Sequence, residues 1–175
     1  IITEIVNPTF EAIKDMGENY KGFLYVGLMI KNNNPYLIEY NVRMGDPECQ
    51  TILPLLATDL LDLILSCCDE TLEKQNILWK EKKSMCVVLC SKGYPDIYKK
   101  NVEIPNIEKI ENNESFFIYH AGTKKKNNKV YADGGRVLNF VSISDNLKLS
   151  REKVIREIEN LNWKEGFYRR DIGYK

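Results

Sequence analysis

One stretch, residues 36–48 (YLIEYNVRMGDPE), constrains the fold and the chemistry of this chain more than any other. Its first half alternates between apolar and polar side chains, as in a β-strand with two unlike faces. The polar face carries a carboxylate, an amide and a guanidinium in a row: Glu39, Asn41 and Arg43. Such a row is unusual in a strand otherwise rich in apolar residues, so this face is our first candidate for a site.

The polar face offers the ligands of a magnesium site. Mg²⁺ takes hard oxygen ligands, often only one or two from the protein, and leaves its other positions to water and phosphate. Glu39 and Asn41 lie two residues apart and offer two such oxygens to one ion. Arg43 then follows where a guanidinium binds a phosphate or carboxylate beside the metal. The solvated face of an edge strand has the same pattern, so this strand alone leaves both interpretations open.

The residues after the strand favour a site. Gly45 to Glu48 predicts a tight loop, with Asp46 as the N-cap of a helix and Pro47 at its first position. The carboxylates of Asp46 and Glu48 therefore lie at the end of the strand, in the kind of connecting loop that commonly carries function.

Composition excludes several classes of protein. The chain has 175 residues, enough for one good core or two small ones, and 25 basic residues balance 25 acidic ones. This balance gives no electrostatic case for nucleic acid, and no apolar run approaches the about 20 residues of a membrane helix. The five cysteines form no C-x-x-C pair, and there is one histidine. We therefore expect no zinc site and a reducing, cytoplasmic location.

The first half predicts helices around an antiparallel hairpin. A helix is expected from Asn7 as N-cap to about Gly17, burying Phe10, Ile13 and Met16. Residues 23–30 predict a buried strand, which pairs with the Glu39 strand across a turn at residues 31–35. A short helix follows Pro47, and a second one begins near Thr58 or Asp59. Its expected core stripe is Leu60, Leu61, Ile64, Leu65 and Cys68.

The second half predicts a separate small domain, with the boundary near Asn76, so that the domains are 1–76 and 77–175. Four strands are expected, at residues 85–90, 115–120, 130–132 and 136–143. The last two are predicted to be joined by a hairpin turn at Asp133–Gly135. A final helix at about 150–161 gives the domain an α+β architecture.

Taken together, several sequence strings resemble those of a known family. Five strings carry the likeness, in order and at family spacing: YKGFLYVGLMI, IEYNVRMGDPECQ, YHAGT, GGRVL and YRRDIGY. They resemble the carboxy-terminal part of the glycinamide ribonucleotide synthetase (phosphoribosylamine–glycine ligase) family, within the ATP-grasp superfamily. The resemblance implies the C-terminal half of an ATP-grasp domain, followed by the small α+β domain. Because the sequence begins without methionine, we expect it to be a piece of a longer protein.

The resemblance also implies an activity of de novo purine synthesis. Such a ligase phosphorylates the carboxylate of glycine with ATP, and the amine of 5-phosphoribosylamine then attacks the glycyl phosphate. Glu39 and Asn41 match the family's ligands for Mg²⁺ (or Mn²⁺), and Glu39 is also expected to contribute to the binding of ATP. Arg43, Asp46 and Glu48 match its R-x-G-D-P-E loop. We expect Arg43 to meet phosphate, and Asp46 and Glu48 to orient the amine substrates, with Arg43 and Asp46 as catalytic candidates.

Three further positions are assigned from the resemblance. Many ATP-grasp relatives carry an acidic metal ligand where this chain has Gly27, so a second ion would have to rely on Glu39 and substrate phosphates. Met29 is expected to form the apolar floor beneath adenine, although alone it fits a core residue. Arg136, on the glycine turn of GGRVL, is expected to bind the 5-phosphate of the sugar, or else to be a hairpin arginine at a domain junction. His120 is given no acid–base role.

Two other readings stay open. One is a sister ATP-grasp ligase or carboxylase acting on another carboxylate, and the other is a non-catalytic module that binds a nucleotide or phosphosugar. The family's ATP-binding lysine and glycine-rich lid would lie upstream of this sequence. We therefore expect a monomer that needs the missing N-terminal part and is inactive alone.

Overall fold

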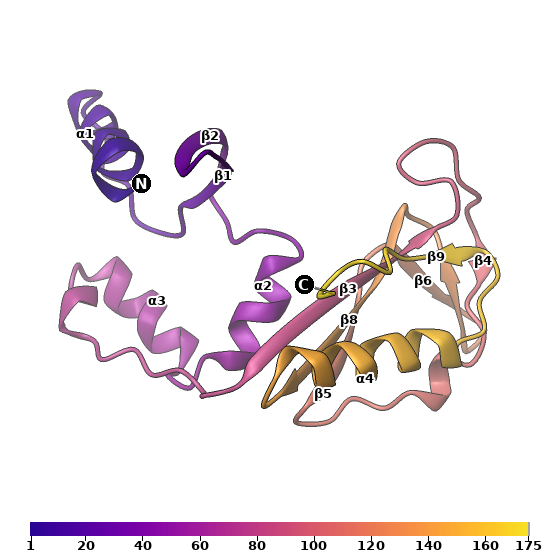
Figure 1. Cartoon of the computed structure of the whole chain (residues 1–175). Coiled ribbons are helices and arrows are strands. Elements are labelled where there is room, and N and C mark those ends of the chain that lie inside the picture. Colours follow the sequence, from indigo (N-terminus) through magenta and orange to yellow (C-terminus); the bar gives the residue numbers. More distant parts are fainter. Residues whose placement is uncertain (175) are drawn as a thin grey trace. The chain divides into compact units, whose positions relative to one another are not determined.

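The chain folds into two compact units, described here for residues 1–174 of a computed structural model (Figure 1). The first unit comprises residues 1–46 and 58–78, and the second comprises residues 47–57 and 79–174. None of the helices among these residues is both long and apolar enough to cross a bilayer. The domain boundary expected near Asn76 stays a prediction, since a division by contacts does not test independent folding.

The first unit is built around the predicted antiparallel hairpin. Strand β1 (Tyr25–Lys31) pairs with β2 (Asn34–Asn41). The two residues between them, Asn32 and Asn33, have φ of 50° and 63°, which is the left-handed geometry of a tight hairpin turn. The helices of this unit are η1 (Ile2–Val6), α1 (Asn7–Asp15), α3 (Leu60–Cys68) and η3 (Leu72–Lys74).

Helix starts in this part of the chain were predicted with mixed success. Asp59 is the N-cap of α3, as expected, and its carboxylate accepts a bond of 2.7 Å from the Leu61 N–H. Asn7 is not an N-cap, because the π-turn η1 runs into α1 and the Asn7 N–H already donates to the Ile2 carbonyl. Asp46 does not cap α2 (Glu48–Ile52) either, since that helix begins one residue later, with Pro47 at the cap.

Burial in the first unit differs from the prediction. Among its described residues no apolar side chain is buried, and the expected core residues Phe10 and Met16 are 42% and 71% exposed. The strand predicted as buried is half-buried in β1 and exposed toward its end. Most of the α3 stripe is also exposed, including Leu61 and Leu65. Within the first unit, no other element buries these apolar faces.

The second unit consists of two antiparallel sheets and several helices. A four-stranded antiparallel sheet has the order β5-β8-β3-β9, and a three-stranded sheet has the order β4-β7-β6. The strands are β3 (Lys83–Ser91), β4 (Val102–Glu103), β5 (Phe116–His120), β6 (Thr123–Lys126), β7 (Lys129–Ala132), β8 (Arg136–Ser144) and β9 (Gly166–Phe167). The helices are α2, η2 (Leu53–Leu55), η4 (Ile107–Lys109) and α4 (Leu147–Asn160). This α+β architecture is the predicted class.

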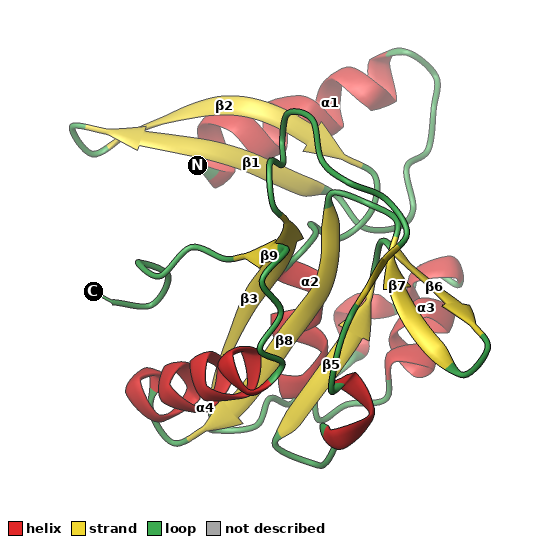
Figure 2. Ribbon diagram, turned by 90° about the vertical axis from the view of Figure 1, so that its right-hand side faces the viewer, coloured by secondary structure: helices red, strands yellow, loops and turns green. Residues whose placement is uncertain are grey.

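The core of the second unit lies between the larger sheet and α4. Strands β3 and β8 pair from Lys83↔Ser144 to Leu89↔Leu138, and α4 packs on these two strands (Figure 2). The short helix α2 contacts the same two strands. Completely or almost completely buried side chains fill the core: Val87, Leu89, Phe116, Leu138, Phe140, Val154 and Leu161. The strands predicted at residues 85–90, 115–120 and 136–143 and the helix predicted at about 150–161 therefore supply this core.

One predicted hairpin is wrong. β7 and β8 are not partners, because β7 pairs with β4 and β6 whereas β8 pairs with β5 and β3. The Asp133 and Gly134 N–H groups both donate to the Gly122 carbonyl, at 2.8 and 3.1 Å. The glycine turn therefore carries the chain from one sheet to the other. The true hairpin is β6–β7, whose tip residues Asn127 and Asn128 have φ of 49° and 59°.

Candidate functional site

Glu39 and Asn41 lie side by side on one face of the hairpin. The Asn41 amide nitrogen Nδ2 donates to the Glu39 carboxylate oxygen Oε1 over 2.9 Å. Glu39 is exposed and Asn41 is half-buried, so neither is inserted into an apolar interior. The two side chains that we selected as candidate ligands thus converge at the end of β2.

A glycine opposite Glu39 leaves space for its carboxylate. Gly27 of β1 is the direct partner of Glu39, and a Cβ built on Gly27 would lie 3.0 Å from the Glu39 Cγ. The register shifts next to this pair, because Leu28 faces Leu37 and leaves Ile38 as the extra residue of a β-bulge. Bulges are common beside functional sites, where they redirect side chains.

Met29 belongs to the same face of the hairpin as Gly27, since the two are separated by one residue of β1. Its side chain is 58% exposed, so it is not a core residue in the described chain. The opposite face is occupied differently, because the Tyr40 hydroxyl hydrogen-bonds to the Thr9 hydroxyl of α1. Helix α1 is therefore bonded to the face that does not carry Glu39.

The R-x-G-D-P-E loop is divided between the two units. Arg43 and Asp46 belong to the first unit, whereas Glu48 opens α2 of the second. The Arg43 guanidinium is exposed and donates to the Met44 carbonyl at 2.9 Å. Gly45 between them is buried, which holds the loop backbone close to its neighbours.

The second unit contains two chain turns that are locked together by their backbones; we call them the paired turns, residues 120–123 and 133–136. Gly122 donates to the Arg136 carbonyl at 2.9 Å, and its own carbonyl accepts from Asp133 and Gly134. A Cβ on Gly122 would come within 2.6 Å of the Gly134 Cα. Only glycine at both positions permits this approach, so the sequence strings HAGT and GGR form one structural feature.

Comparison with known proteins gives a consistent result for both units. Residues 84–175 match the family Phosphoribosylglycinamide synthetase, C domain, and residues 1–49 match its ATP-grasp (A) domain. The chain belongs to the phosphoribosylglycinamide synthetase family.

Individual relatives agree with this assignment. The chain is 43% identical over 173 residues to the phosphoribosylamine–glycine ligase of Fusobacterium nucleatum, covering 98% of this chain and 41% of the relative. It is 43% identical over 169 residues to the ligase of the same name from Caldanaerobacter subterraneus, covering 97% and 40%. The crystal structure of the Thermotoga maritima ligase is 31% identical, with a TM-score of 0.80 over 98% of this chain and 42% of that one. The chain thus spans about two fifths of the length of these relatives.

The phosphoribosylglycinamide synthetase assignment places the candidate residues in two family domains. The hairpin with Glu39 and Asn41 lies in the part that matches the ATP-grasp domain, and the paired turns lie in the part that matches the C domain. Among residues 1–174 no group of three or more His, Cys, Asp or Glu side chains is arranged to hold a metal ion. A metal on the hairpin would therefore need further ligands from water or substrate.

Arg136 opens β8 at the end of the paired turns. Its residue is exposed, and it is the register partner of Cys90 on β3, next to a second register shift at Val137. Burial raises the pKa of the Cys90 thiol, and the nearby Arg136 guanidinium opposes this rise because a cation stabilises a thiolate. Arg136 is therefore an exposed residue whose positive charge is close enough to act on a buried thiol.

His120 has a local partner within the paired turns. Its ring nitrogen Nδ1 lies 2.9 Å from the Thr123 hydroxyl, and both side chains border a hollow of about 740 Å³ beside η4. No sequence pattern points to two other neighbours of these turns: Ser91, which bonds to Gly134, and Tyr94, which packs on Gly135. Contacts across a sheet leave no periodicity in the chain.

Proposed function

We propose that this chain provides the metal-binding hairpin and the C domain of a phosphoribosylamine–glycine ligase. The reaction would join glycine to 5-phosphoribosylamine with ATP, through a glycyl phosphate, to give glycinamide ribonucleotide, ADP and phosphate. The names of the relatives and the two matched family domains support this proposal. None of the five cysteines, all of them among the described residues, forms a disulfide, which fits the reducing cytoplasm as the location.

The observation that carries the proposal is the convergence of Glu39 and Asn41. An octahedral Mg²⁺ with ligand distances near 2.1 Å places neighbouring ligand oxygens about 3 Å apart. The terminal atoms of Glu39 and Asn41 are 2.9 Å apart. Turning the Asn41 amide about its last bond brings its oxygen to that spacing, so the pair fits two adjacent corners of such an ion. Mn²⁺ accepts similar oxygen ligands.

We assign these residues the following work in the reaction. Glu39 and Asn41 would hold the metal, and a bound Mg²⁺ would neutralise charge on the ATP phosphates during transfer to the glycine carboxylate. Met29 would lie beneath adenine on the same face. Because a carboxylate and a polyphosphate repel each other, the protein contributes chiefly by fixing their positions and excluding water from the glycyl phosphate.

Substrate contacts are proposed for four charged residues. Arg43 carries the guanidinium suited to a phosphate, while Asp46 and Glu48 are anions suited to orient an ammonium or amine. Arg136 follows two glycines, so an anion can approach its exposed guanidinium closely. We assign it the 5-phosphate of phosphoribosylamine.

The test uses the full-length synthetase that contains this sequence. Glu39→Gln keeps the size of the side chain but removes its charge, so the apparent KM for Mg·ATP should rise at least about tenfold and kcat should fall. Glu18→Gln, an exposed change in the same unit, is the matched control. Near-normal activity of Glu39→Gln at ordinary Mg²⁺ contradicts the metal assignment. ADP release that depends on a carboxylate other than glycine would instead indicate a sister ligase.

A further inference from the structure

We propose that Ser91 and Tyr94 are positioning residues for Arg136: they fix the glycine turn before Arg136 and thereby place its guanidinium for the sugar phosphate. This inference rests on the proposed function, in which Arg136 binds the 5-phosphate of phosphoribosylamine. Neither residue is expected to touch the substrate. Their action is on the backbone of Gly134 and Gly135.

Ser91 binds the carbonyls of both glycines. Its backbone N–H donates to the Gly135 carbonyl and its hydroxyl donates to the Gly134 carbonyl, each over 2.8 Å. Ser91 is only 3% exposed, so both bonds are shielded from competing water. A buried carbonyl that loses its donor is costly, which makes this pair of bonds a strong constraint on the turn.

Tyr94 covers the same turn with its ring. A Cβ built on Gly135 would lie 2.1 Å from the Tyr94 Cδ2, so the ring packs directly on the Gly135 backbone. The ring of Tyr98 meets that of Tyr94 edge-on, with centroids 6.3 Å apart. Tyr94 itself is held by a bond from its N–H to the Ser91 carbonyl. The two positioning residues therefore form one local support.

The remaining sides of the turn are held by other strands. Gly122 donates to the Arg136 carbonyl at 2.9 Å, and Gly134 donates back to Gly122 at 3.1 Å. Cys90 pairs with Arg136 across β3 and β8. The backbone of the turn is thus hydrogen-bonded to Ser91 and Gly122 and paired with β3, while Arg136 stays exposed. Rigid support beneath an exposed cation is what preorganised binding of an anion requires.

The test compares two substitutions of Tyr94 in the full-length synthetase. Tyr94→Ala removes the ring from Gly135, so the KM for phosphoribosylamine should rise about tenfold, with kcat and the KM for ATP changed by less than about threefold. Tyr94→Phe keeps the ring and should restore the KM. Ser91→Ala, a smaller change, should raise the same KM in the same selective way.

A double substitution separates positioning from general damage. If Tyr94 acts through Arg136, the variant Arg136→Ala/Tyr94→Ala has the same KM for phosphoribosylamine as Arg136→Ala alone. Additive effects, or a parallel rise in the KM for all three substrates, overturn the proposal. As a readout without turnover, amide exchange at Gly134 should be faster in Tyr94→Ala than in Tyr94→Phe.

The same set of variants distinguishes the two proposals. A raised KM in Arg136→Ala with an unchanged KM in both Tyr94→Ala and Ser91→Ala overturns the positioning role alone. An unchanged KM in Arg136→Ala overturns the phosphate role of Arg136, and the positioning role with it. A selective rise in all three variants supports both.

Discussion

At the scale of single residues, Gly27 shows how an absent side chain shapes a site. Many ATP-grasp relatives are expected to carry an acid here, yet in this chain the position faces Glu39 and a Cβ would meet the Glu39 Cγ at 3.0 Å. The glycine is therefore part of the seat of the Glu39 carboxylate.

We predict that Gly27→Ala raises the Mg²⁺ concentration needed for half-maximal activity by about three- to tenfold, because the new methyl group displaces the flexible Glu39 side chain. Overall stability should change by less than about 1 kcal/mol, since this glycine does not need a left-handed φ. Activity measured against Mg²⁺ tests the first part. In a Glu39→Gln background the alanine should add nothing, and an independent further loss would contradict this explanation.

The raised pKa of Cys90 leads to a prediction about the reactivity of its thiol. Burial raises the pKa of its thiol, so at a given pH a smaller fraction is thiolate, which is the reactive form. At pH 8 we expect iodoacetamide to label Cys90 at least about tenfold more slowly than the exposed Cys68. Mass spectrometry of a labelling time course measures both rates in one sample, and equal rates would show that Cys90 is not buried.

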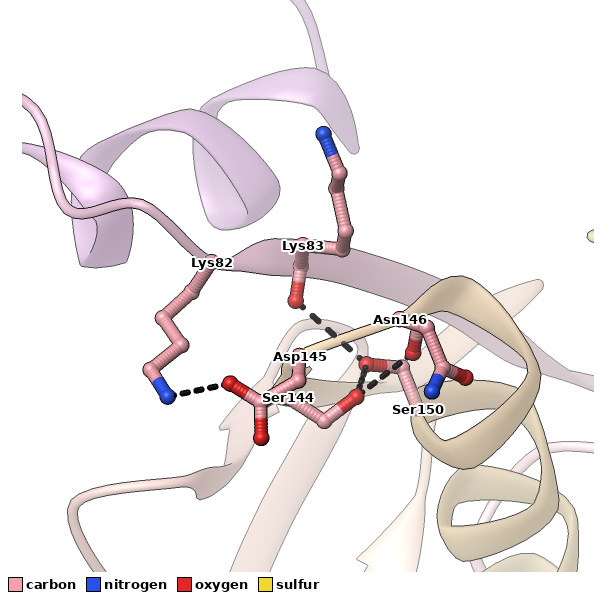
Figure 3. Close-up of polar contacts among 6 residues, drawn as sticks. All are labelled: Lys82, Lys83, Ser144, Asp145, Asn146 and Ser150. Carbon is pink, nitrogen blue, oxygen red and sulfur yellow. Dashed lines mark hydrogen bonds and ion pairs between the residues drawn. The ribbon is translucent and has the colours of Figure 1, made fainter.

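At the scale of elements, the start of α4 is fixed by a polar network (Figure 3). The Asn146 side chain accepts from the Leu149 N–H at 2.9 Å, and the Ser144 hydroxyl donates to the Asn146 carbonyl at 2.6 Å. Ser150, completely buried, lies 2.8 Å from the Ser144 hydroxyl and reaches the Lys83 carbonyl. These bonds start the helix three residues earlier than the sequence predicted.

We predict that Asn146→Ala destabilises the second unit by about 1 kcal/mol, the usual cost of a lost N-cap. Asn160→Ala at the other end of α4 is the matched control, since Asn160 is exposed and its side chain donates to the Glu157 carboxylate one turn earlier in the same helix. Urea unfolding of the full-length protein measures the loss of stability. Hydrogen exchange at the Leu149 amide measures separately whether the cap is lost. Equal losses in the two variants would contradict the capping role.

The strand connections show which element-level signals a sequence lacks. The glycine-rich turn at Asp133–Gly135 has the composition of a hairpin, and we predicted one. Instead it crosses between sheets, because Gly134 packs against Gly122 twelve positions earlier in the chain. A turn's composition reports its local backbone freedom, whereas its partners are set by residues distant in sequence.

At the scale of the whole molecule, the two units differ in how well they are supported. The second buries a continuous set of apolar side chains, whereas among its described residues the first buries none. Local stability follows the density of buried apolar contacts. The hairpin and α3 expose apolar side chains within the first unit, and the family relatives are more than twice as long as this chain.

We predict that in the isolated 175-residue chain the amides of β1 and β2 exchange at least about a hundredfold faster than those of β3 and β8. We also expect no glycine-dependent release of ADP from it. Hydrogen exchange with mass spectrometry and a coupled ADP assay test these statements. Protection of the hairpin equal to that of β3 would show that this unit is stable alone, and turnover would show that the chain is self-sufficient.

The sequence by itself determined the hairpin, the α+β class, four of the seven strands among the described residues of the second unit and the placement of Glu39 and Asn41 on one face. These features depend on alternation, turn residues and spacing over a few positions, which the chain carries locally. The five family strings led to the same family assignment as the comparisons with known proteins.

Only the tertiary structure decided which of these faces are buried, and that the turns at Gly122 and Gly134 form one feature. It also identified Ser91 and Tyr94 as the support of the Arg136 turn, although nothing in their spacing indicated it. The physical reason is the same in each case: burial and backbone approach are set by contacts between residues far apart in the chain. A local pattern fixes which side of an element is apolar, but the rest of the fold decides what covers it.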